Sequence, residues 1–143
     1  MKDFFSIVLI LASFLFIRNC TAQQTNENLQ RQWMMVEFDQ YDKEFLSKDK
    51  AYIDFSPTKT NPNQYGAYMG CNQMFFTAKM KSGGKIEISD IGATMMYCEG
   101  AMDLEKTFAE KFPTMTNYSI DGHYLTLFDS KGNTMKFVAA DWD

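Results

Sequence analysis

Short segments that alternate apolar and polar residues recur from Trp33 to the end of the chain, and residues typical of turns separate them. The segment "AYIDFS" shows the pattern, because Ala51, Ile53 and Phe55 fall on one face of the expected strand and the residues between them on the other. A strand of this kind buries only one face, so it must pair with others over a shared core. The pattern predicts a mainly β protein with short antiparallel strands.

We expect about eight short strands from this pattern. They cover residues 33–39, 51–56, 64–70, 73–80, 85–89, 117–121, 124–129 and 134–139. Gly83-Gly84 and Asp121-Gly122 lie between consecutive segments and are typical of hairpin turns. The strands on either side of each turn are therefore expected to be antiparallel neighbours.

One segment departs from the two-residue period. Leu104, Phe108 and Phe112 recur at four-residue spacing with charged residues among them, which predicts one amphipathic helix of about three turns. Pro113 ends it. The chain is thus expected to pack a single helix against its strands.

The N-terminal segment is typical of a secretory signal peptide. An apolar run extends from Phe4 to Ile17 and is too short to span a bilayer comfortably, although an uncleaved anchor is an alternative. Cleavage after Ala22 would make residues 1–22 the signal peptide and leave a soluble protein. Alternatively, residues 1–19 are a lipoprotein signal and Cys20 is the lipidated first residue of the mature chain, whose lipid then holds it on a membrane.

The remainder of the chain divides into a leader and one domain. Residues 23–32 are polar and without periodicity, which predicts a flexible leader, and residues 33–143 are enough for one domain with a modest core. Lysine and arginine number 14 against 18 aspartates and glutamates, giving a formal net charge of −4. A nucleic-acid partner needs a basic stripe, which this sequence lacks, so we expect none.

Two cysteines, Cys71 and Cys98, remain whichever processing scheme applies. In an oxidising compartment two thiols on neighbouring strands usually form a disulfide, which would stabilise the fold by about 3 kcal/mol. The alternatives are two buried free thiols and, less favoured because no CxxC motif or nearby cation is evident, a redox pair.

The sequence offers little for a metal or cofactor site. His123 is the single histidine and follows a turn, so we expect it to face solvent. The 11 methionines make a Cu(I) carrier conceivable, but adjacent residues such as Met34 and Met35 point to opposite faces of a strand. We therefore interpret the methionines as core filling and expect no metal and no cofactor.

The search for catalytic residues is equally negative. The carboxylates show no diagnostic pairing, and Ser89 and Ser119 lack the G-x-S-x-G setting of a hydrolase nucleophile. Gly83-Gly84 lies between strands and does not open a helix, so it is not a phosphate loop. The sequence favours a protein that is not an enzyme.

Several motifs occur in a fixed order along the chain. They are Trp33, Gly66, Gly70-Cys71-Asn72, the T-x-M-x-C match Thr94-Met95-Met96-Tyr97-Cys98, the helix residues Leu104, Glu105 and Phe108, and the closing segments Tyr118–Gly122 and Leu125–Leu127. In these features the chain resembles the META domain family of HslJ-like envelope proteins. The resemblance implies a partly open antiparallel β-barrel with one packed helix. It also implies a stress-associated role in the periplasm, or as an outer-membrane lipoprotein, of a bacterium, with no agreed reaction.

The chain departs from this family at Phe75-Phe76-Thr77, where members often carry a glycine, and we expect these bulky residues to alter a bulge or fill a groove. Two binding hypotheses follow for a monomeric, non-enzymatic protein. In the first, an apolar ligand such as an acyl chain lies between helix and barrel, lined by Phe75, Phe76, Phe108 and Phe112. In the second, an exposed strand edge or apolar patch docks an envelope protein.

Overall fold

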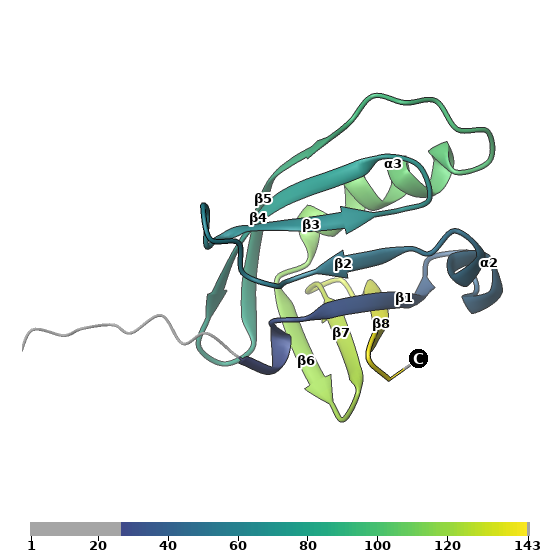
Figure 1. The fold of residues 1–143 in the computed structure, drawn as a ribbon. Coiled ribbons are helices and arrows are strands. Elements are labelled where there is room, and N and C mark those ends of the chain that lie inside the picture. The colour runs from purple at the N-terminus through teal and green to yellow at the C-terminus, as the bar shows by residue number, and fades with distance from the viewer. Residues whose placement is uncertain (1–26, 143) are drawn as a thin grey trace, which may run out of the picture.

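The computed structural model describes residues 27–142 and forms an eight-stranded antiparallel barrel (Figure 1). The strands are β1 (Gln32–Phe38), β2 (Tyr52–Asp54), β3 (Gln64–Tyr68), β4 (Gln73–Lys81), β5 (Lys85–Ala93), β6 (Asn117–Asp121), β7 (Tyr124–Phe128) and β8 (Thr134–Ala139). The predicted fold class is confirmed. The predicted signal peptide and Cys20 lie outside the described residues.

Each strand pairs with the next along the chain, and β1 pairs with β8 to close the ring. Most neighbouring strands share three to seven register pairs, but β5 and β6 share only Lys85 with Asn117. Two further backbone bonds support this junction, from Ile86 N to Thr116 O and from Tyr118 N to Gly84 O. The barrel is therefore weakly closed at one seam, which we call the β5–β6 seam.

The predicted helix is confirmed as α3 (Met102–Lys111), which continues into a 3-10 turn, η3 (Phe112–Thr114), that contains Pro113. A second, shorter helix, α2 (Lys43–Lys48), was not predicted. The side chain of Asp42 caps α2 by accepting a hydrogen bond from the backbone N–H of Phe45 at 2.9 Å. Because α2 has six residues and buries only Leu46, its sequence shows no helical period.

The predicted flexible leader is wrong for its last residues. Glu27–Leu29 form a 3-10 turn, η2, and Leu29 is fully buried in the core. The Trp33 indole N–H donates to the Leu29 carbonyl at 3.0 Å. Leu29 was overlooked because one apolar residue in a polar stretch carries no periodic signal.

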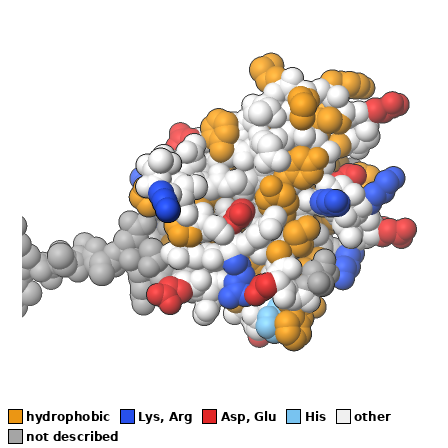
Figure 2. All heavy atoms as spheres, in the orientation of Figure 1, with side chains coloured by type: hydrophobic (Ala, Val, Ile, Leu, Met, Phe, Trp, Pro, Cys, Tyr) orange, Lys and Arg blue, Asp and Glu red, His pale blue; other side chains and the backbone are white. Residues whose placement is uncertain are grey.

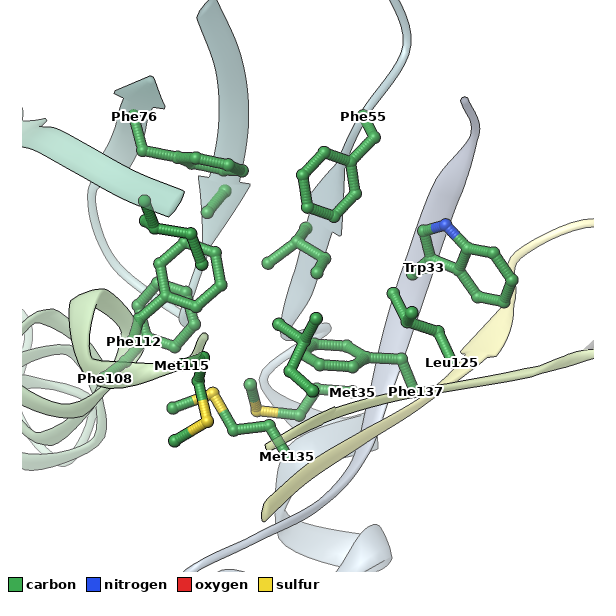
Figure 3. Packing of buried hydrophobic residues seen from close by; sticks show 14 of the residues in the cluster. Trp33, Met35, Phe55, Phe76, Phe108, Phe112, Met115, Leu125, Met135 and Phe137 are labelled. Carbon is green, nitrogen blue, oxygen red and sulfur yellow. The ribbon is translucent and has the colours of Figure 1, made fainter. Parts of the chain in front are cut away.

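Aromatic and methionine side chains fill the barrel (Figure 3). Phe76 of β4 meets Phe112 edge to face at a centroid distance of 4.8 Å, and Phe108 of α3 stacks on Phe112 at 4.5 Å. Met35, Met115 and Met135 lie below these rings, among other buried methionines. The interpretation of methionine as core filling is confirmed for these residues, and the hydrophobic residues of α3 close the interior.

Candidate functional site

The connection between β5 and α3 exposes large apolar side chains. We call residues 94–100 the stapled loop, which forms the long arc between these elements in Figure 1. Met95 is 100% exposed, Tyr97 83% and Met96 56%, the highest exposures among the large hydrophobic residues except Trp142 at 61%. Core filling is therefore the wrong interpretation for Met95 and Met96. Solvent contact of this much apolar surface points to a binding role.

A disulfide fastens this loop to the barrel. Cys98, in the loop, is bonded to Cys71, which lies between β3 and β4, and their Cα atoms are 5.7 Å apart. The predicted pairing is confirmed, so the two cysteines are not free thiols in this structure. The bond holds the loop's end against the connection between β3 and β4.

Asn72, next to this disulfide, is a second anchor for the loop and is only 2% exposed. Its side-chain oxygen accepts hydrogen bonds from the Thr94 hydroxyl at 2.8 Å and the Met96 N–H at 2.7 Å. Its amide nitrogen donates to the Met96 carbonyl at 3.1 Å and to Glu105 Oε1 at 2.7 Å. These partners lie more than 20 residues further along the chain than Asn72.

Glu105 completes this anchor from the helix side. It lies in the first turn of α3 and is 8% exposed, and its second oxygen accepts the backbone N–H of Asn72 at 2.8 Å. A carboxylate in the first turn of a helix is also stabilised by the helix dipole. Loop, sheet and helix thus meet at one buried polar cluster, which fixes the backbone while Met95 and Tyr97 stay in solvent.

Gly70 permits the sharp path into this cluster. Its φ is 99°, and a Cβ there would lie 3.0 Å from the Cβ of Asp49 and 3.2 Å from that of Ala101. Both the conformation and the space therefore favour glycine.

A row of apolar side chains also crosses the outside of the barrel. Val138, Met34, Tyr52 and Tyr68 occupy consecutive register pairs from β8 through β1 and β2 to β3, and the two tyrosine rings stack at 6.0 Å. Figure 2 shows apolar side chains gathered over β1 to β3 on this face. This outer row ends at Tyr68, directly before the β3–β4 connection that holds Cys71 and Asn72.

The structure does not bring the four predicted ligand-lining phenylalanines together. Phe76, Phe108 and Phe112 are at most 1% exposed and pack on one another, whereas Phe75 is 47% exposed on the outer face. Its ring covers Gly92, where a Cβ would lie 2.1 Å from the ring's Cζ. Grouping Phe75 with the others was wrong, because consecutive residues of a strand point to opposite faces.

The departure from the family pattern at these residues has a local result. Phe75 pairs with Gly92 and Thr77 with Ser89, so β5 carries one extra residue in a bulge, and Asp90 there has a φ of 51°. The bulge expected from these residues lies in β5, and the Phe75 ring covers Gly92 on the neighbouring strand.

The remaining chemistry candidates are scattered. His123 is half-buried and stacks on Trp142 at 3.6 Å. A cavity of about 160 Å³ gathers Glu37 and Asp39, but each carboxylate forms an ion pair with a lysine, Lys136 at 2.8 Å and Lys111 at 2.9 Å. Within residues 27–142 no group of three histidine, cysteine or acidic side chains is placed to hold a metal ion. In the same part of the chain, no helix is long and apolar enough to cross a membrane.

Comparison with known sequences identifies one family. The model of the META domain matches residues 27–142, which begin at the 3-10 turn η2 rather than at Trp33. No curated protein sequence matches the chain.

Solved structures share the fold at low identity. An NMR structure of a protein from Burkholderia xenovorans has a TM-score of 0.61 at 14% identity, covering 78% of this chain and 82% of that one. A crystal structure of a DUF4847 family protein from Bacteroides vulgatus has a TM-score of 0.53 at 12% identity, covering 77% of this chain and 92% of the other. At these identities the likeness concerns the fold alone.

Proposed function

The chain belongs to the META domain family, and from this premise we propose that it is an exported, non-enzymatic envelope protein that docks a protein partner through the stapled loop. The observation that carries the proposal is the exposure of Met95, Met96 and Tyr97 on a backbone that is fixed from within. An ordered apolar loop loses less conformational entropy on binding than a flexible loop does. The same contact area therefore gives a higher affinity.

The chemistry of the loop suits a protein partner. Tyrosine and methionine are enriched at the centres of protein interfaces, and methionine adapts to irregular surfaces. Glu99 and Asp103 flank the exposed residues, and this charge disfavours an anionic membrane surface. We therefore propose an apolar recess with a neutral or basic rim as the partner's surface.

Export and a place in the bacterial envelope are part of the same proposal. The apolar N-terminal run and the Cys71–Cys98 disulfide support them, since disulfides persist mainly in oxidising compartments. We also propose that the protein has a role in stress responses and that the chain is processed either after Ala22 or at Cys20. We propose a monomer without a cofactor or nucleic-acid partner.

Site-specific photo-crosslinking in the native host tests the docking surface. A benzophenone amino acid replaces Tyr97 in one strain and Lys59, in the exposed β2–β3 connection, in a matched control strain. We expect a discrete protein adduct from position 97 and none from position 59. The variant M95S/M96S, combined with the probe at position 97, should reduce that adduct at unchanged expression. Equal adducts at both positions, or none at position 97, would overturn the docking proposal.

The alternative function is a carrier for an apolar ligand between helix and barrel. The mutual contacts of Phe76, Phe108 and Phe112 favour docking over this alternative, because those rings occupy the proposed ligand space. Native mass spectrometry of protein purified from its own envelope distinguishes the two. A retained small molecule would favour the carrier, and a bare chain or a protein complex would favour docking.

A further inference from the structure

The β5–β6 seam leaves one edge of a strand without a neighbouring strand. β5 pairs along its length with β4, but on its other side the register pairing in residues 27–142 stops at Lys85. The N–H of Ile86 points to this side, since it donates to the Thr116 carbonyl at 3.0 Å. Backbone direction alternates along a strand, so the N–H and C=O of Ile88 face the same side.

A groove lies beside this edge. It has a volume of about 270 Å³, and its lining combines an apolar group with charged residues from the β4–β5 hairpin. The apolar group is Ile86, Ile88, Pro113 and Met115, and the charged residues are Lys81, Lys85 and Glu87. The volume is several times the share of one liquid water molecule, about 30 Å³, so the groove has room for a side chain of a partner.

The charges next to the groove are unbalanced. Lys81 and Lys85 lie directly opposite each other in the register of β4 and β5, an arrangement that repels like charges. Lys79 lies opposite Glu87, and Lys81 turns aside to bond Glu87 at 2.8 Å. Lys85 donates instead to the Asn117 side-chain oxygen at 3.1 Å. Three lysines thus lie near one carboxylate, in a chain whose net charge is −4. An added carboxylate between Lys81 and Lys85 would relieve their repulsion.

We propose that the β5–β6 seam binds an extended, acidic peptide segment of a partner, which adds as a strand to the unpaired edge of β5, beside η3. The backbone of Ile88 supplies the strand hydrogen bonds, the apolar lining takes one side chain, and Lys81 and Lys85 take an alternating carboxylate. An extended peptide satisfies all three features together. This site is separate from the stapled loop and does not depend on it.

The test uses a synthetic eight-residue peptide that alternates glutamate with valine. Titration into the folded protein, followed by amide chemical shifts, should move the signals of Ile86 and Ile88 most. The double variant K81E/K85E should weaken binding at least tenfold, whereas K59E, an exposed lysine on the β2–β3 connection, should leave it unchanged. M95S/M96S should also leave it unchanged, which keeps this result independent of the docking loop.

Three further probes distinguish the occupants. The same peptide with N-methylated amides on its binding edge should lose at least tenfold in affinity, and a lysine–valine peptide should not bind. Dodecanoate tests for an anionic amphiphile in place of a strand. Undiminished binding of the N-methylated peptide would overturn the added-strand proposal. Displacement of the bound peptide by a lower concentration of dodecanoate than of competing unlabelled peptide would also overturn it. So would shifts that avoid Ile86 and Ile88.

Discussion

Asn72 and Glu105 lie 33 residues apart in sequence, yet two N–H groups of Asn72 donate to the two oxygens of the Glu105 carboxylate, at 2.8 and 2.7 Å. The Asn72 side-chain oxygen accepts hydrogen bonds from Thr94 and Met96, and its nitrogen also donates to the Met96 carbonyl. One buried amide therefore connects the β3–β4 turn, the stapled loop and α3. A buried polar cluster of this kind specifies one loop conformation, because leaving any member unpaired is costly.

Removing either member of this pair should destabilise the protein. N72A should lower the free energy of unfolding by about 2–3 kcal/mol, because several buried groups lose their partners. E105Q should also destabilise, since its amide presents a donor to a donor of Asn72. Urea denaturation measures both, with E110Q, an exposed position on the same helix, as the control expected within about 0.5 kcal/mol of wild type. An E105Q variant as stable as E110Q would contradict the role of the pair.

The disulfide should contribute about 3 kcal/mol of stability, because it closes a loop with a sequence separation of 27 in the unfolded chain. C71A/C98A and reduced wild type should show this loss in urea, and amide exchange in residues 94–98 should accelerate. Alkylation of envelope material without reduction should leave both cysteines unmodified and linked. Two alkylated thiols would show that the bond does not form in the cell.

Phe75 and Gly92 should be energetically coupled. G92A should cost about 1 kcal/mol, because its Cβ displaces the Phe75 ring from the position it occupies over the glycine. In an F75A background the same change should be neutral or slightly stabilising, since alanine restricts the unfolded chain more than glycine. A double-mutant cycle measures the coupling. Equal effects of G92A in both backgrounds would show that the ring contact is not what constrains position 92.

Hydrogen peroxide should oxidise the stapled loop first. Hydrogen peroxide transfers one oxygen atom to each thioether, which becomes a sulfoxide, and the peroxide leaves as water, at a rate that follows the exposure of the sulfur. Peptide mass spectrometry should show Met95 and Met96 modified at least about tenfold faster than the buried Met35 and Met69. The photo-crosslink from position 97 should fall in parallel, because a sulfoxide is polar. Oxidation without loss of the adduct would count against methionine contacts in docking.

The stability contribution of Asp129 should depend on pH. The Asn133 side chain, donating at 2.7 Å, is the main cause that lowers the pKa of Asp129, with backbone N–H groups of the same turn adding to it. A lowered folded pKa gives stability that is present above the unfolded value of about 3.9 and is lost as pH falls through the folded value.

D129N should therefore lower the melting temperature at pH 7, and the difference from wild type should narrow below about pH 4. D141N, which alters an exposed ion pair with Arg31, serves as the control with a small effect. A D129N difference that stays constant from pH 7 to pH 2 would show that the charge of Asp129 does not carry the effect.

Local patterns predicted much of the fold. Alternation identified all eight strands, and four-residue spacing identified α3, because both patterns follow from which face an element buries. The sequence pattern did not predict the turn at Leu29 or the helix α2. Each buries one apolar residue, so neither shows a hydrophobic period. The grouping of Phe75 with Phe76 was avoidable, since strand geometry alone places neighbours on opposite faces.

The strand and helix segments and the family resemblance follow from the sequence alone, since they depend on neighbours in the chain and on recurring motifs. The tertiary structure was needed to show that Cys71 is bonded to Cys98 and that Asn72 meets Glu105. It was also needed to show that Met95 and Tyr97 face solvent and that the barrel closes weakly at the β5–β6 seam. These features depend on contacts between residues far apart in sequence. Packing and burial select those contacts, and no local pattern encodes them.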